Sequence, residues 1–167
     1  KNFLHKKLWL NGKLNRKLIA KSATFIASEL NLNVSKDAKI LMVEESGVGS
    51  KFLFSGEKLS PILTVYKARN FSEAKKLAHK ILKYQGIGHS IGIHTKVNER
   101  VLELGLDLPV CRVIVNQAHT FATGGSFTNG LPFSLSMGCV TWQKNTIDNN
   151  LNYEHFLNIT RIANLIP

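Results

Sequence analysis

Short apolar runs alternate with one-sided helical segments through the middle of the chain, and this alternation constrains the fold more than any other feature. Residues 72–84 and 98–106 repeat apolar side chains at the spacing of an amphipathic helix. Around them lie runs typical of strands, at 39–43, 62–68, 89–95 and 111–116. Strands that alternate with helices predict an α/β domain with an open, largely parallel, twisted sheet flanked by helices.

The ends of the chain and one long connection complete the predicted organisation. The spacing of apolar residues predicts a helix over 14–30, and Ser72 is expected to cap the helix that runs to Tyr84. Residues 117–136 are rich in Gly, Ser, Thr and Asn, and a loop of that length in a compact domain is more often functional than accidental. We therefore predict one domain over 1–153, followed by a C-terminal strand over 154–167.

Length and cysteine usage narrow the class of protein. The 167 residues suit one domain or a large part of one, and the first residue, Lys1, suggests a piece of a longer protein. No run approaches 18 apolar residues, so no membrane span is expected, and the first residues lack the features of a signal peptide. Two cysteines without an export signal are expected to be reduced thiols in a cytoplasmic protein.

Positive charge is concentrated in the first half of the chain. Residues 1–83 hold 17 Lys and Arg against 6 Asp and Glu, whereas residues 84–167 hold 5 of each. A basic half of a chain can bind nucleic acid or another polyanion. Alternatively, its charges can form a solvated surface or a face that contacts an acidic neighbour. The lysines are scattered along helices without interleaved exposed aromatic residues, so nucleic acid is not the expected partner.

Candidate sites for chemistry are few. His89 and His94 are five residues apart on a predicted strand, which places them on opposite faces, and no other group has a ligand spacing, so no metal site is expected. The glycine-rich segments 86–90 and 123–130 lack the order of a nucleotide-binding loop. Cys139 is either a nucleophile on a tight turn or a structural cysteine, and Cys111 is expected in the core.

Two long segments carry a resemblance to a known family. These are "EKLSPILTVYKARNFSEAKKLAHKI" with "GIGHSIGIHT", and "RVIVNQAHTFATGGSFTNGLPFSLSMGCVTW" with "NLNYEHFLNITRI". They resemble the catalytic domain of aldehyde dehydrogenases, within them the coenzyme-A-acylating branch, and most closely the sulfoacetaldehyde dehydrogenase type. The resemblance implies a parent enzyme that oxidises a small aldehyde with NAD or NADP and uses coenzyme A as co-substrate.

The resemblance also assigns roles to residues. It implies that the nucleophilic cysteine lies upstream of this chain, that Cys139 is structural, and that the chain alone is inactive. Glu57 matches the glutamate that binds the nicotinamide ribose, and Leu59 the residue that packs near the nicotinamide. His89 matches an active-site histidine of the acylating branch. Gly124, Gly125 and Asn129 match the loop that borders the aldehyde pocket, and the C-terminal strand is expected to pair with a neighbouring subunit in a homo-oligomer.

One segment departs from the family pattern. Val140, Gln143 and Lys144 stand where the family usually has glycines. Side chains at these positions are expected to disturb a turn that needs a positive φ or a close approach of the backbone. This departure leaves open that the chain is a catalytically dead fragment. The excess of positive charge leaves open that it is a basic module that binds polyanions.

Overall fold

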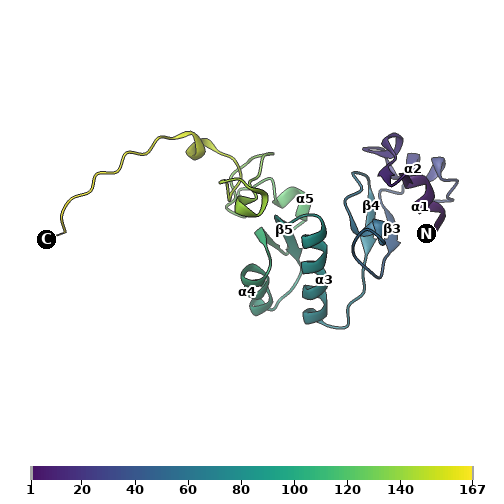
Figure 1. Ribbon diagram of the computed structural model, residues 1–167, viewed down its shortest axis with the longest axis horizontal. Coiled ribbons are helices and arrows are strands. Elements are labelled where there is room, and N and C mark those ends of the chain that lie inside the picture. Colours follow the sequence, from purple (N-terminus) through teal and green to yellow (C-terminus); the bar gives the residue numbers. More distant parts are fainter. Residues whose placement is uncertain (1, 167) are drawn as a thin grey trace. The chain divides into compact units, whose positions relative to one another are not determined.

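The computed structural model describes residues 2–166 (Figure 1). They form two compact units that meet in sequence at Gln85 and Gly86. Each unit is described by itself. No helix of the described residues is long and apolar enough to cross a membrane.

The first unit, up to Gln85, contains two small sheets and three α-helices. Strands β3 and β4 are parallel, with Leu41 opposite Ile62 and Glu44 opposite Val65. The elements in chain order are α1 (Asn2–Leu8), β1 (Trp9–Leu10), β2 (Lys13–Leu14), η1 (Arg16–Leu18), α2 (Ala23–Glu29), β3 (Leu41–Glu44), η2 (Leu53–Ser55), β4 (Ile62–Val65) and α3 (Phe71–Tyr84).

An apolar cluster forms the core of the first unit. Its largest fully buried side chain is Phe54, whose ring meets Trp9 edge-on with centroids 4.9 Å apart. The other fully buried large apolar residues come from α1, from α2 and from the residue after it: Leu8, Ile26 and Leu30. Helices and the β3–β4 pair thus share one core, to which Leu41, Val43 and Ile62 contribute the strand side.

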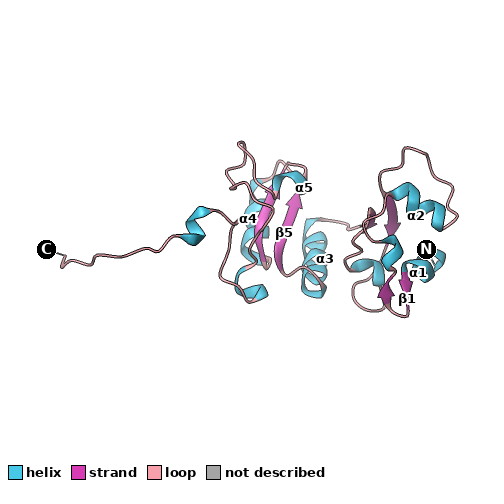
Figure 2. Cartoon of the chain, turned by 90° about the horizontal axis from the view of Figure 1, so that it is seen from above, coloured by secondary structure: helices cyan, strands magenta, loops and turns pink. Residues whose placement is uncertain are grey.

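The second unit, from Gly86 onward, is built on the parallel pair β5–β6 (Figure 2). In this pair Ser90 lies opposite Arg112 and Ile93 opposite Val115. Helix α4 joins the two strands, as a parallel pair requires a crossover. The elements are β5 (Gly88–Ile93), α4 (Asn98–Asp107), β6 (Val110–Val115), α5 (His119–Ala122), η3 (Val140–Gln143) and η4 (Tyr153–Phe156).

The predicted α/β class with parallel strands is confirmed, and the predicted strands and the helix over 98–106 lie within a few residues of their observed bounds. The single open sheet is not formed within the described residues. Their hydrogen-bonded strands make three separate two-stranded sheets, β1–β2, β3–β4 and β5–β6.

The continuous helix over 14–30 is wrong. Ala20 takes a left-handed conformation (φ 57°), which interrupts the segment between η1 and α2. Ser22 then caps α2, because its hydroxyl accepts a hydrogen bond from the backbone N–H of Phe25 at 3.1 Å.

The cap predicted at Ser72 is also wrong. Helix α3 begins at Phe71, and the side-chain oxygen of Asn70 accepts from the N–H of Glu73 at 2.9 Å. The Glu73 carboxylate in turn accepts from the N–H of Arg69 at 2.7 Å. Asparagine is as good a cap as serine, so local sequence alone did not separate the two positions.

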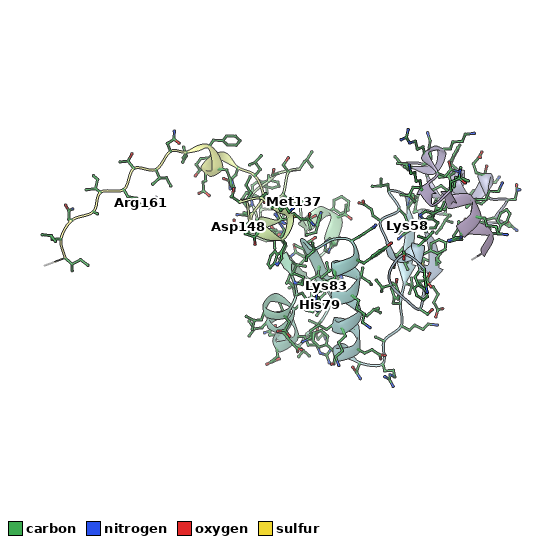
Figure 3. All side chains as sticks on the ribbon, viewed as in Figure 1. Lys58, His79, Lys83, Met137, Asp148 and Arg161 are labelled. Atoms are coloured by element: carbon green, nitrogen blue, oxygen red, sulfur yellow. The ribbon has the colours of Figure 1, made fainter. Side chains whose placement is uncertain are left out.

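The C-terminal tail forms no strand among the described residues. After η4, residues 157–166 are exposed and run without regular structure, and Figure 3 shows Arg161 on this extended segment. A lone strand leaves its backbone groups unpaired, so its alternating sequence pattern is not enough to form one within a single chain. Pairing with a neighbouring subunit stays a prediction.

Candidate functional site

Two histidines and a serine form a hydrogen-bonded group at the start of β5. The Ser90 Oγ lies 2.8 Å from His119 Nε2 and 3.1 Å from His89 Nδ1. His89 and Ser90 come from β5, and His119 is the first residue of α5, directly after the neighbouring strand β6 and its short connection. The ring of His89 is exposed, whereas Ser90 and His119 are half-buried. The His89 imidazole is therefore open to solvent, and the less exposed Ser90 and His119 support it through hydrogen bonds.

The surroundings of His119 favour the neutral form of its imidazole. Burial lowers the pKa of its imidazole, and the neighbouring His89 lowers that pKa further. A neutral imidazole has one N–H donor and one acceptor nitrogen, so His119 can take a definite place in a chain of hydrogen bonds.

The loop after α5 is fixed by Asn129. The Asn129 amide nitrogen donates to the Ala122 carbonyl at 2.9 Å and to Gln117 Oε1 at 3.2 Å. Its oxygen accepts from the N–H groups of Ser126 at 3.2 Å and Leu131 at 3.1 Å. One half-buried side chain thus ties the two ends of this turn together.

Gly124 and Gly125 lie in the same loop. The N–H of Ser134 donates to the Gly124 carbonyl at 3.0 Å, and Gly125 has a positive φ of 87°. A Cβ at position 125 would overlap the backbone of Pro132, so only glycine fits there. Gly125 also lines a hollow of about 330 Å³ together with Gln117, Ala118, Phe121, Ala122 and Ser126.

Glu57 and Leu59 lie on an exposed loop of the first unit. Lys58 between them anchors the loop, since its Nζ donates to the carbonyls of Phe54 at 2.9 Å and Gly56 at 2.7 Å. Burial lowers the pKa of the Lys58 ammonium, opposed by the charge of Glu57. The Glu57 N–H donates to Gln85 Oε1 at 2.7 Å. The Glu57 carboxylate is exposed, and Leu59 holds a positive φ of 47° with its side chain half in solvent.

Cys139 lies in a tight turn against β5. A Cβ at Gly88, whose φ is 81°, would lie 2.7 Å from the Cys139 carbonyl oxygen and 3.0 Å from the Trp142 Cβ. No hydrogen bond joins the Cys139 thiol to a histidine within residues 2–166. The structural role of Cys139 stays a prediction. Cys111, expected in the core, is only half-buried, because alternate residues of β6 face a less covered side.

Two of the three residues that depart from the family pattern lie on strained backbone. Val140 and Lys144 have positive φ values of 51° and 58°. A β-branched residue in that region is a genuine outlier, which agrees with the expected disturbance of a glycine turn. The side chain of Gln143 forms a hydrogen bond, in which its Nε2 donates to the Ile87 carbonyl at 2.9 Å.

A buried arginine joins β6 to the segment that follows α5. Arg112 is 5% exposed, and its Nε donates to Asn150 Oδ1 at 3.1 Å while Nη1 donates to the Gly138 carbonyl at 3.1 Å. Asn150, fully buried, donates from Nδ2 to the carbonyls of Thr123 at 2.9 Å and Pro132 at 2.8 Å. Met137 and Asp148 lie in the same segment, in which Met137 bridges to Asn150 (Figure 3). This network fixes the loop that carries Gly124, Gly125 and Asn129.

The predicted site residues fall into two groups. The second unit holds His89, Gly124, Gly125 and Asn129, while Glu57 and Leu59 belong to the first unit. Sequence reasoning missed Ser90, His119, Arg112 and Asn150 as supporting residues. A polar residue at an inward position of a strand, such as Arg112, was the one signal available for them. No group of three or more His, Cys, Asp and Glu suited to a metal ion occurs in the described part of the chain.

Known proteins that are similar in sequence to this chain include acylating and acetylating aldehyde dehydrogenases. The chain is 51% identical over 158 residues to an acylating sulfoacetaldehyde dehydrogenase of Cupriavidus necator. It is 39% identical over 156 residues to an acetylating succinate-semialdehyde dehydrogenase of Clostridium kluyveri. The chain is homologous to the acylating aldehyde dehydrogenases. The two alignments each cover 93% of the chain but only 32% and 34% of the relatives, so it spans about a third of their length. No family model matches the chain.

A solved structure shows the same fold. The acetylating aldehyde dehydrogenase of Geobacillus thermoglucosidasius superposes with a TM-score of 0.90 at 35% identity. The superposition covers all of this chain and 37% of that enzyme. The elements described above therefore correspond to one portion of that enzyme.

Proposed function

We propose that the protein to which this chain belongs is an acylating aldehyde dehydrogenase, which oxidises a small aldehyde to its acyl-CoA with NAD or NADP. Sulfoacetaldehyde is the substrate to test first. The observation that carries the proposal is the 51% identity to an acylating sulfoacetaldehyde dehydrogenase, which spans 158 residues and 93% of this chain. The nucleophilic cysteine is assigned to a part of the parent protein outside this chain.

Glu57 is the proposed contact to the cofactor. Its exposed carboxylate can accept hydrogen bonds from two vicinal hydroxyls, which suits the ribose of a nicotinamide nucleotide, and the half-exposed Leu59 offers an apolar surface beside it. The bound nucleotide would supply the hydride acceptor. The role of this chain is to orient the ribose, and Lys58 supports that role because it holds the loop in one conformation.

His89 and the loop of Gly124, Gly125 and Asn129 are proposed to border the substrate pocket. The hollow lined by Gly125 is large enough for a small aldehyde. Asn129 and the Arg112–Asn150 network hold this loop, so its backbone can present a fixed wall to the substrate. His89 offers an exposed imidazole that can donate a hydrogen bond or take a proton.

The first test is a steady-state assay of the complete gene product. We expect reduction of NAD or NADP that requires both sulfoacetaldehyde and coenzyme A. Glu57→Gln is expected to raise the KM for the nucleotide about tenfold with a smaller effect on kcat, because a carboxylate accepts stronger hydrogen bonds than an amide. Glu44→Gln, which also removes an exposed carboxylate of the first unit, is the matched control and is expected to leave that KM unchanged. Absence of any coenzyme-A-dependent product formation would reject the function.

The basic first half of the chain suggests how an anionic substrate is attracted. Lys13, Arg16 and Lys17 are exposed around β2 and η1. We propose that they help to hold the sulfonate of the substrate or the phosphates of coenzyme A. Reversing these three charges is expected to raise at least one of the two Michaelis constants, and two unchanged constants would contradict the role.

The rival proposal of a polyanion-binding module rests on the same excess of positive charge. It predicts oligonucleotide binding that weakens steeply as salt is added. Lack of a mobility shift at low salt would reject the polyanion-binding proposal.

The free thiols of Cys111 and Cys139 are compatible with the reducing cytoplasm, which we propose as the location of the enzyme.

A further inference from the structure

The ring of His119 is seated on one face of β5. Ser90 and Gly92 are two residues apart on this strand, so they point to the same face, and His119 contacts both. A Cβ at position 92 would lie 2.7 Å from His119 Nδ1. The absence of a side chain at Gly92 therefore gives the imidazole the room it needs to reach the Ser90 hydroxyl.

The single hydroxyl proton of Ser90 limits the directions that the two hydrogen bonds can take. Ser90 has one hydroxyl proton and can donate it to only one of the two histidines. No acceptor lies within hydrogen-bond reach of His119 Nδ1 among residues 2–166. Of the two ring nitrogens, only Nε2 has a hydrogen-bond partner among these residues, and we assign the proton of neutral His119 to that nitrogen. Nε2–H then donates to Ser90 Oγ, and the Ser90 hydroxyl donates to His89 Nδ1.

This direction determines what His89 presents to a ligand. When Nδ1 accepts a hydrogen bond, the proton of a neutral imidazole is on Nε2. The exposed ring of His89 then offers Nε2–H as a donor to an oxygen atom of the substrate. We propose that His119 is a positioning residue, which acts through Ser90 to hold the orientation and the tautomer of His89. The identity of the substrate oxygen rests on the proposed function, whereas the tautomer does not.

The direct test is ¹⁵N magic-angle-spinning NMR of the histidine side chains in the complete protein, with the His89 signals assigned by their loss in His89→Gln. At a pH where His89 is neutral, we expect protonated Nε2 and unprotonated Nδ1. Ser90→Ala and Gly92→Ala are expected to give a mixture of both tautomers. Gly92→Ala keeps every polar group and only displaces His119. A His89 spectrum unchanged in both variants, or one with the proton on Nδ1 in the unmodified protein, would overturn the proposal.

Conservative variants separate positioning from mere folding. Ser90→Thr keeps the hydroxyl, and His119→Gln keeps an N–H that can donate to it, so both are expected to retain the Nε2–H tautomer of His89. His119→Leu is expected to lose it. Equal loss in His119→Gln and His119→Leu, with folding intact by circular dichroism, would contradict a role that depends on the donated hydrogen bond.

Kinetics provide a second readout. Ser90→Ala and Gly92→Ala are expected to lower kcat about tenfold with little change in the KM for the nucleotide, and Ser90→Thr to restore most of it. An unchanged kcat in the presence of a changed tautomer would overturn the positioning role. If the unmodified protein has no acylating activity, the proposed function fails, and the NMR result alone decides the tautomer.

Discussion

The largest fully buried side chains differ in kind between the two units of the chain. In the first unit the fully buried large residues are all apolar, Phe54, Leu8, Ile26 and Leu30, whereas in the second the one such residue is Asn150. Apolar packing is non-directional and tolerates many substitutions of similar volume. A buried polar network depends on every hydrogen bond, because each group left unpaired is penalised. The second unit is thus expected to tolerate fewer substitutions in its buried polar network, and that network holds the loop with Gly124, Gly125 and Asn129 in one geometry.

Removing the largest side chain of the apolar core tests the first half of this comparison. Phe54→Ala is expected to lower the free energy of unfolding by about 3–5 kcal/mol, because it leaves a cavity and removes the edge-on contact with Trp9. Urea unfolding measures the loss, and hydrogen exchange should locate it in residues 2–85. Phe156→Ala, at a side chain that is 75% exposed, is the control and should change the free energy by less than about 0.5 kcal/mol. A similar loss in both variants would show that Phe54 is not a core residue.

Breaking the polar network tests the second half. Asn150→Ala removes the partner of Arg112 Nε and leaves the carbonyls of Thr123 and Pro132 without their donor. We expect a loss of about 3 kcal/mol, together with faster hydrogen exchange in the loop over 122–134. Asn149→Ala, at the neighbouring half-buried position, is the matched control with a smaller expected loss. An intact loop in Asn150→Ala would mean that the network does not fix it.

The same contrast explains what could be predicted from the sequence. Apolar periodicity alone placed β3 to β6 and α4 close to their observed bounds, since burial of an apolar face follows from local spacing. The partners of Arg112, by contrast, are 26 and 38 positions away in sequence, at Gly138 and Asn150. The link from Ser90 to His119 likewise spans 29 positions. No local sequence pattern encodes such pairs. The hydrogen bonds that support the candidate site could therefore not be predicted from the sequence and are seen only in the structure.

Relieving a strained turn in the second unit is expected to raise the free energy of unfolding. Val140 holds a φ of 51°, a region that disfavours β-branched residues and suits glycine. Val140→Gly is expected to raise the free energy of unfolding by about 1 kcal/mol, because relief of the left-handed strain exceeds the added entropy of the unfolded chain. Val140→Ala keeps a Cβ in the same conformation and should gain less. A loss of stability in Val140→Gly would mean that the turn does not impose this backbone.

The smallest expected effect concerns the pH dependence of the second unit. The folded-state pKa of His119 lies below its ordinary value, so the unfolded chain binds more protons than the folded chain as pH falls through about 6.5. The free energy of unfolding is therefore expected to fall as the pH is lowered from about 7 to about 5. This part of the slope should be absent in His119→Gln, which cannot take up the proton. Urea unfolding at several pH values measures the two slopes. Since His119 is only half-buried, the difference between them should be well below the effect of Asn150→Ala. Equal slopes would mean that the hydrogen-bonded group at the start of β5 does not resist protonation, and that burial in this unit constrains geometry without tuning charge.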